Sequence, residues 1–224
     1  MSPDSGNMQE VIFIVAGGPL PNLLFLQRRI LDIRPDELIG VDGGTCHLLN
    51  LGLRPQTVIG DLDSLARDVV DCLRESGCRV LQYPCKKDET DTELALQYAL
   101  DRKPRLIEIY GALGGRIDHT LANISLLVVA AERGIETRIV DCSEELFVVS
   151  SQSEILGNPG QIVSILPLTS TVTGITLRGF EYPLLDGRME AGKPYGISNR
   201  LLHDKGMIQV TSGYLLVIKT KAEE

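Results

Sequence analysis

Carboxylates follow four short, strand-like apolar runs of the sequence. Asp42 comes directly after ELIGV, and Asp61 and Asp63 come just after TVIG. The acidic stretch KKDETD lies just after RVLQYP, and a glycine-rich segment separates RLIEIYG from Asp118. The carboxyl ends of parallel strands lie at one edge of a sheet, which is where such sheets bind ligands. The pattern therefore predicts that these acids converge on one site.

The chemistry of such a site would need a cation. Close carboxylates raise one another's pKa unless a positive charge compensates them. In an extended D-x-D segment, Asp61 and Asp63 would share one face and could bind a single cation. Mg²⁺ usually takes one or two carboxylates together with substrate phosphates, so the acids predict a metal–nucleotide site.

Glycines and a basic residue beside the acids suit phosphate binding. Gly43, Gly44, Gly114 and Gly115 would allow a phosphate close to the backbone. The stretch GGRIDHTLAN opens a predicted helix whose first amides could hold an anion, and Arg116 offers a bidentate contact.

Each element also has a plainer interpretation. Asp63 could cap a helix that begins near Ser64, and Asp42 could belong to a turn in which glycine supplies the positive φ. Thr90 and Glu93 form a T-x-x-E capping box, which places acids in the first turn of a helix without any metal. His119 could be a helix-start residue, and Lys86 a solvated lysine, with no chemical role. The recurrence of acids at successive strand ends favours the functional interpretation.

The elements that would position these residues are predicted from hydrophobic periodicity. Strand-like runs alternate with helical patterns over the first part of the chain, which predicts an α/β domain with a mainly parallel sheet flanked by helices. The expected strand runs are VIFIVAGG, ELIGVDGG, TVIGD, RVLQYP, RLIEIYG and TRIVD, and the expected helices are LLFLQRRILD, CHLLNLG, ARDVVDCLRESG, ELALQYALDRK and HTLANISLLVVAAERG.

The pattern changes near residue 144. FVVSS, QIVSILPL, TVTGITLRG, GMIQVTSG and YLLVIKT are short β-type runs separated by turn residues, and no comparable helix intervenes. We expect a catalytic α/β domain at residues 1–143 and a smaller all-β, sandwich-like domain at residues 144–224.

Composition excludes several classes of protein. The net charge of −8 and the pI near 5.0 argue against binding to nucleic acid or an anionic membrane. No apolar run can span a bilayer, and the N-terminus MSPDSGNMQE has no basic signal region. The five cysteines include no C-x-x-C pair, so we expect reduced thiols. We therefore expect a cytoplasmic protein.

A resemblance to a known family rests on an ordered set of motifs. DGG (42–44), GDLDS (60–64), KDETDTELAL (87–96), GALGGRIDHTLANI (111–124) and GISN (196–199) resemble those of the thiamine pyrophosphokinase family. The match covers most of the chain in the right order, and GDxDS, KDxTDxExAL and GGRxDHxLxN are together highly specific. The resemblance implies an α/β domain followed by a β-sandwich, with active sites formed across a homodimer.

The implied reaction is transfer of the pyrophosphoryl group of ATP to the hydroxyl of thiamine, which gives thiamine diphosphate and AMP. The resemblance implies Mg²⁺ as cofactor, held by Asp61, Asp63, Asp88 and Asp91, and implies that Asp118 contacts thiamine or accepts its hydroxyl proton. These five acids are the expected catalytic residues. The expected substrate-binding residues are Asp42, Gly43, Gly44, Lys87, Thr90, Gly115, Arg116, His119, Ser198 and Asn199, with the last two binding thiamine from the partner subunit.

Two departures concern thiamine binding. Arg200 stands where many family members carry an acid, and the chain has no Trp to stack on the thiamine ring. Tyr182, Tyr195 or Tyr214 could replace it, although tyrosines in β domains more often pack in the core. Rival interpretations are a Mg²⁺-dependent phosphohydrolase, which needs no acceptor, and a non-catalytic nucleotide or thiamine sensor.

Overall fold

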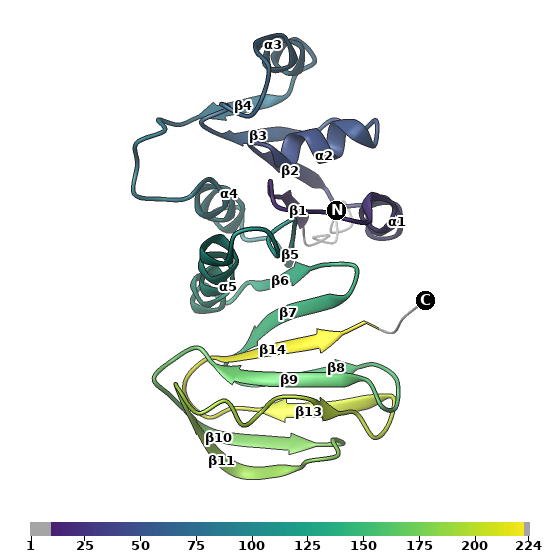
Figure 1. Cartoon of the computed structure of the whole chain (residues 1–224), viewed down its shortest axis with the longest axis vertical. Helices are drawn as coiled ribbons and strands as arrows, with labels where there is room; N and C mark the ends of the chain where they lie inside the picture. Colours follow the sequence, from purple (N-terminus) through teal and green to yellow (C-terminus); the bar gives the residue numbers. More distant parts are fainter. Residues whose placement is uncertain (1–9, 222–224) are drawn as a thin grey trace, which may run out of the picture. The chain divides into compact units, whose positions relative to one another are not determined.

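The computed structural model describes residues 10–221, which form two compact units that divide between Ala112 and Leu113. The first unit contains a parallel sheet and helices, and the second contains one long helix followed by strands (Figure 1). The predicted order of an α/β domain followed by an antiparallel β domain is confirmed. The predicted functional division at residues 143 and 144 stays a prediction.

The first unit is built on five parallel strands in the order β5-β1-β2-β3-β4. Their bounds are β1 Val11–Val15, β2 Glu37–Val41, β3 Thr57–Gly60, β4 Arg79–Gln82 and β5 Leu106–Tyr110. Every residue of β1, β2, β3 and β5 is buried, which explains why these segments read as near-continuous apolar runs. Only β4, at the edge, is partly exposed.

Four helices connect these strands: α1 Leu23–Ile33, α2 Gly44–Asn50, α3 Arg67–Glu75 and α4 Asp91–Leu100. In Figure 1, α1 and α2 lie on one face of the sheet and α4 on the other. This is the arrangement expected when right-handed crossovers first extend the sheet from β1 to β4 and then return to β5. The loops after β2, β3 and β4 consequently lie at one edge, as the sequence predicts.

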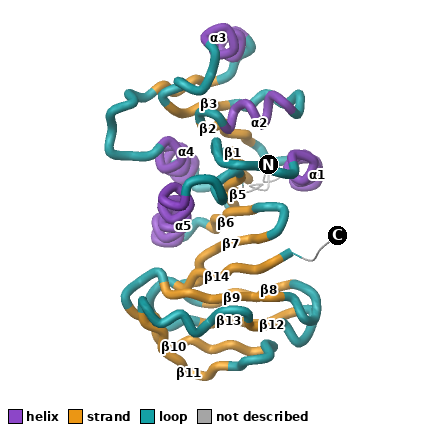
Figure 2. Tube along the Cα trace, viewed as in Figure 1, coloured by secondary structure: helices purple, strands orange, loops and turns teal. Residues whose placement is uncertain are grey.

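The second unit begins with α5 Ile117–Glu132 and continues as strands and loops only, as far as the described residues extend (Figure 2). The strands are β6 Glu136–Val140, β7 Glu144–Val149, β8 Gln152–Leu156, β9 Ile162–Pro167, β10 Thr171–Arg178, β11 Leu184–Glu190, β12 Asn199–Arg200, β13 Lys205–Gln209 and β14 Leu215–Thr220. They pair antiparallel in two groups, β6-β7-β14-β9-β12 and β8-β13-β10-β11.

A single apolar core joins the two groups of strands. It contains side chains of the first group, such as Ile165 and Val217, and of the second, such as Ile175 and Ile208. Face-to-face packing of two antiparallel sheets is a β-sandwich, so the predicted sandwich is confirmed.

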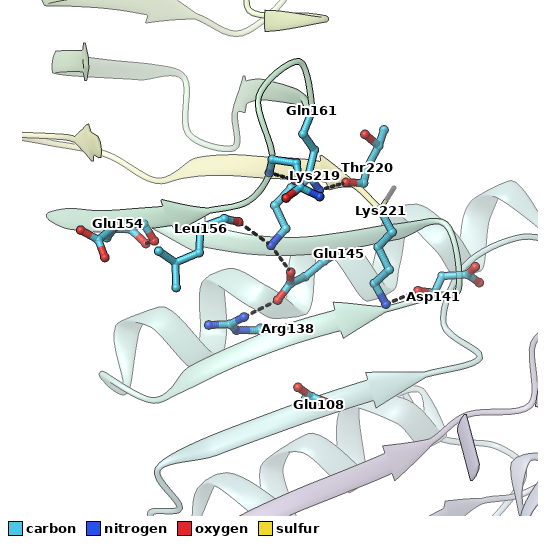
Figure 3. Close-up of polar contacts among 12 residues, drawn as sticks. Glu108, Arg138, Asp141, Glu145, Glu154, Leu156, Gln161, Lys219, Thr220 and Lys221 are labelled. Atoms are coloured by element: carbon cyan, nitrogen blue, oxygen red, sulfur yellow. Dashed lines mark hydrogen bonds and ion pairs between the residues drawn. The ribbon is translucent and has the colours of Figure 1, made fainter. Parts of the chain in front are cut away.

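Ion pairs cross three neighbouring strands of the second unit (Figure 3). Arg138 on β6 donates to Glu145 on β7, and Lys219 on β14 lies 2.9 Å from the same carboxylate. Arg138 also lies over the ring of Phe147, with its guanidinium carbon 5.6 Å from the ring centroid. Because each charge has an opposite partner, this side of the sheet tolerates a nearly buried carboxylate.

The sequence analysis did not predict the strands β8 and β11 or the two-residue strand β12. None of the helices within residues 10–221 is both long and apolar enough to cross a membrane. The expectation that the N-terminus contains no signal region rests on residues 1–10. Residues 1–9 lie outside the described residues.

Candidate active site

The loop after β2 positions Asp42 and two glycines. Asp42 itself has the positive φ of this turn, +43°, whereas Gly43 has helical angles, so the expectation that glycine supplies the positive φ is wrong. The carbonyl of Asp42 accepts the amide of Thr45 in the first turn of α2, which begins at Gly44. Gly44 is required for close packing, since a Cβ there would lie 2.0 Å from the carbonyl oxygen of Val15.

The loop after β3 carries the D-x-D motif in a turn rather than an extended segment. Leu62 has φ +66° and its side chain is buried with Leu65 and Val70. The expected extended conformation is therefore wrong: the chain reverses here so that Leu62 can enter the core. The Asp63 amide donates to Asp61 Oδ1 at 3.2 Å across the turn.

The turn still brings the acids together. Asp42, Asp61 and Asp63 each offer one carboxylate oxygen, and the three oxygens lie within 4.8 Å of one another. Ser64 links the group, because its hydroxyl lies 2.5 Å from Asp42 Oδ2 and 3.2 Å from Asp63 Oδ1. Asp63 does not cap a helix, since α3 begins later, at Arg67, and its N-cap Ala66 makes no side-chain bond.

These residues fit a hard divalent cation. All three donors are carboxylates, the ligand type that Mg²⁺ and Ca²⁺ prefer. Asp42 Oδ1 is covered from solvent, and no hydrogen-bond donor among residues 10–221 reaches it. The pKa of Asp61 is lowered, first by the hydrogen bond from the Asp63 amide and also by the Cys85 thiol and the Lys87 charge, so Asp61 stays ionised. The predicted convergence of Asp42 with Asp61 and Asp63 is confirmed, whereas the sequence analysis assigned Asp42 to the nucleotide and did not predict the contacts of Ser64.

The loop from β4 to α4 holds the second group of predicted metal ligands. Thr90 caps α4 by accepting the Glu93 amide at 3.1 Å, which confirms the predicted cap. Asp91, the first residue of α4, lies 2.9 Å from Lys87 Nζ, and Asp88 is exposed. No metal ligation by Asp88 or Asp91 follows from these contacts alone, so their role stays a prediction.

The glycine-rich loop of the second unit leads into α5. Gly114 and Gly115 have φ of +76° and +67°. Arg116 and Asp118 form a bidentate pair, with Nε to Oδ1 at 3.1 Å and Nη2 to Oδ2 at 2.5 Å, although both side chains are largely exposed. The Arg116 hydrogen bond lowers the pKa of Asp118. His119 is exposed and donates its amide to Asp118 Oδ1.

In the β-sandwich, Ser198 and Asn199 differ in exposure and in contacts. Ser198 is exposed and has φ +59°. Asn199 is only 7% exposed, and its side chain bridges the backbone of Tyr182, accepting the amide at 3.0 Å and donating to the carbonyl at 2.9 Å. Arg200 bonds the carbonyl of Gly160 at 3.1 Å.

A pocket of about 190 Å³ lies beside Asn199. Tyr182 and Tyr195 line it and are 65% and 58% exposed, so the alternative that they pack in the core is wrong. The hydroxyl of Tyr195 donates to the Arg188 carbonyl at 2.8 Å, which fixes the orientation of its ring. The pocket thus combines fixed aromatic surface with the apolar side chains of Met189 and Ile197.

The fold and the carboxylate cluster together define an α/β enzyme of phosphate chemistry that carries an additional β-sandwich. Residues 34–139 match the model of the thiamin pyrophosphokinase catalytic domain, and residues 150–215 match that of the thiamin pyrophosphokinase vitamin B1 binding domain. The chain belongs to the thiamine pyrophosphokinase family.

Individual relatives agree with this assignment. Thiamine pyrophosphokinase of Bacillus subtilis (strain 168) is 33% identical over 217 residues, which cover 94% of this chain and 99% of that protein. The crystal structure of thiamine pyrophosphokinase from Bacillus subtilis matches with a TM-score of 0.81 at 32% identity, over 96% of this chain and 100% of that chain. The thiamin pyrophosphokinase structure from Geobacillus thermodenitrificans matches with a TM-score of 0.79 at 34% identity, over 96% and 99%.

Proposed function

We propose that this enzyme transfers the pyrophosphoryl group of ATP to the hydroxyl of thiamine. The hydroxyl oxygen attacks the β-phosphorus, the bond from that phosphorus to the α,β-bridging oxygen breaks, and AMP leaves. The hydroxyl proton is released at the same time. The observation that carries the proposal is the carboxylate cluster of Asp42, Asp61 and Asp63 in a chain of this family.

Mg²⁺ is the proposed cofactor, with Asp61 and Asp63 as ligands and Asp42 beside them. When bound, the ion would neutralise charge on the phosphate oxygens of ATP. We assign Asp88 and Asp91 to the same ion or to its water ligands. Support for a metal comes from the solvent-covered oxygen of Asp42 and from the ionised state of Asp61.

The nucleotide is assigned to the loop of Gly43 and Gly44, with Arg116 and Lys87 contacting its phosphates. Arg116 would exchange its bidentate contact with Asp118 for an equivalent contact with a phosphate, since both groups present two anionic oxygens to the two N–H donors of the guanidinium. The contact with Arg116 is the main cause of the lowered pKa of Asp118, so its loss to a phosphate would make Asp118 a stronger base. We therefore assign Asp118 to contacting thiamine or to accepting its hydroxyl proton.

Thiamine is assigned to the sandwich, with Ser198 and the pocket of Tyr182 and Tyr195 as its contacts. The electron-rich faces of tyrosine rings attract a cationic ring such as thiazolium. Arg200 bonds the Gly160 carbonyl and lies 3.9 Å from the carboxylate of Glu181, so its partners lie within the sandwich itself. Asn199 acts through Tyr182, whose backbone it holds.

We further propose a homodimer with active sites shared between subunits, in the cytoplasm. Large apolar side chains of the sandwich are exposed, among them Leu185 at 78% and Tyr182 at 65%. Apolar surface of this kind is commonly covered in an oligomer. The family resemblance supplies the rest of the argument.

The experiment is an incubation of purified protein with ATP, Mg²⁺ and thiamine, followed by chromatographic separation of the products, with controls lacking thiamine or containing EDTA. Thiamine diphosphate and AMP in equal amounts, formed only with metal and thiamine, is the expected result. ADP with thiamine monophosphate would replace the proposal by single-phosphoryl transfer. Phosphate released without thiamine would identify a hydrolase, and binding without turnover a sensor.

A further inference from the structure

Lys87 covers one of the carboxylates that the proposed function assigns to metal. Its ammonium lies 2.9 Å from Asp91 Oδ1 and donates to the Pro84 carbonyl at 3.1 Å. The two side chains are only 12% and 25% exposed. The pair therefore has a defined place at the start of α4, where the Thr90 cap fixes the backbone of Asp91.

The ammonium and a metal ion would compete for this oxygen, since two positive charges at one carboxylate oxygen repel each other. Asp91 Oδ1 is covered from solvent, and Lys87 Nζ occupies the position next to it. Direct coordination of a divalent cation brings it to about 2.0–2.6 Å from the oxygen, which is closer than the ammonium now lies. A metal ion at this oxygen would therefore repel the Lys87 ammonium at close range and weaken its contact with Asp91.

The charge of Lys87 also reaches the first group of carboxylates. The pKa of Lys87 is raised, mainly by its hydrogen bond to Asp91 and further by the charges of Asp91 and Asp61. Lys87 in turn contributes to the lowered pKa of Asp61. The positive charge of Lys87 thus acts on Asp61 of the β3 loop as well as on Asp91 of α4.

We propose that Lys87 serves as the built-in counter-cation of the metal-free site and is displaced from Asp91 when a divalent cation binds. The displaced ammonium is then available to a phosphate of the nucleotide. Lysine suits this exchange because its charge is compact and its stem has four flexible carbons. The inference rests on the proposed function and deepens it. Lys87 would be a positioning residue that pairs with Asp91 in the metal-free site and with a nucleotide phosphate once the metal has bound.

The test is Mn²⁺ binding to the full-length protein without nucleotide, measured as the loss of the free-Mn²⁺ signal in electron paramagnetic resonance. Lys87→Met removes the competing ammonium, so Mn²⁺ should bind about threefold to tenfold more tightly, the effect of losing a partly exposed ion pair. Lys86→Met is the matched control, because Lys86 is an exposed neighbour and the change in net charge is the same. Equal effects of the two substitutions would overturn the inference, as would weaker binding by Lys87→Met.

A second comparison identifies the partner. In an Asp91→Asn background, Lys87→Met should no longer tighten Mn²⁺ binding beyond the effect of Lys86→Met, because the exchanged carboxylate charge is gone. A persistent effect would overturn the assignment to Asp91. Lys87→Met should also slow formation of thiamine diphosphate while it tightens metal binding.

The two proposals fail in different ways. Tighter Mn²⁺ binding by Lys87→Met in a protein that forms no thiamine diphosphate would overturn the reaction and leave the exchange standing. Thiamine diphosphate formation together with unchanged Mn²⁺ affinity in Lys87→Met would overturn the exchange alone.

Discussion

Asp63 is the residue at which the metal assignment is tested most directly. It is the exposed member of the three-carboxylate cluster, and its side chain contacts Ser64 rather than the core. Asp63→Asn keeps the shape and removes one negative charge, so kcat/KM should fall by about 100-fold or more. Circular dichroism should be unchanged. Asp71→Asn, on the exposed face of α3, is the control and should keep full turnover; near-normal turnover of Asp63→Asn would remove Asp63 from the metal site.

Ser198 and Asn199 are adjacent in sequence but should respond differently to substitution. Asn199→Ala leaves the amide and carbonyl of Tyr182 without their partners and should lower the free energy of unfolding by about 2–3 kcal/mol, measured in urea. Ser198→Ala should leave the unfolding curve unchanged and raise KM for thiamine. An Asn199→Ala variant with unchanged stability and a raised KM alone would assign Asn199 to direct thiamine binding.

At the scale of single residues, the sequence predicted the acids of the cluster but not how they meet. D-x-D and DGG lie some twenty positions apart, and neither motif shows that Ser64 bonds an acid of each. The left-handed turn at Leu62 was also unpredictable, because leucine rarely adopts positive φ and nothing in its immediate sequence requires it. These features depend on where the sheet places the two loops.

The elements β6, β7 and β14 share a buried carboxylate that should respond to pH. Burial raises the pKa of Glu145, but the charges of Arg138 and Lys219 outweigh it, and the net pKa lies below the ordinary 4.5. Because the pKa of Glu145 is lower in the folded state than in the unfolded state, its ionised form stabilises the protein at a pH above the unfolded-state pKa. This contribution is lost as the pH falls through the folded-state pKa. Stability of the second unit should therefore decline as the pH falls below about 4.5.

The variant Glu145→Gln isolates this effect. It should lower the free energy of unfolding at pH 7 by about 1–3 kcal/mol, because Arg138 keeps Glu136 as a second partner. The variant should also reduce the fall in the free energy of unfolding below about pH 4.5, measured by urea unfolding at a series of pH values. Glu132→Gln, at the exposed end of α5, is the matched control. If Glu145→Gln lost stability below about pH 4.5 as steeply as the wild type, another carboxylate would be responsible for the loss of stability in acid.

At the scale of elements, periodicity predicted all helices and all strands of the parallel sheet. Apart from β4, those strands are buried along their length, so their sequences are mostly apolar, with Glu37, Thr57 and Glu108 as buried polar exceptions. It missed β11 because this strand contains Asp186 and Gly187, a pair typical of turns, and Asp186 indeed has φ +51° within a register shift. It missed β8 because QSEIL has few apolar residues.

The whole molecule offers a test of the shared site. If each active site combines the carboxylates of one subunit with the sandwich of its partner, mixing Asp63→Asn with Ser198→Ala should rebuild one intact site in each mixed dimer. At a thiamine concentration at which Ser198→Ala alone is nearly inactive, equimolar subunit exchange should then give about a quarter of wild-type activity, since half of the dimers are mixed and each has one of two sites. Activity no higher than the average of the two parent variants would place both residues in one subunit, and sedimentation showing an active monomer would exclude the shared site.

The left-handed Leu62 has a consequence for reading such motifs. The middle position of D-x-D is usually written as a wildcard, yet here it must tolerate positive φ and fill an apolar cavity at once. β-Branched residues fail the first requirement and glycine or asparagine the second. The residue between the two aspartates is therefore restricted by the fold even though the motif leaves it open. A saturation library at position 62 should yield few variants that remain folded and active.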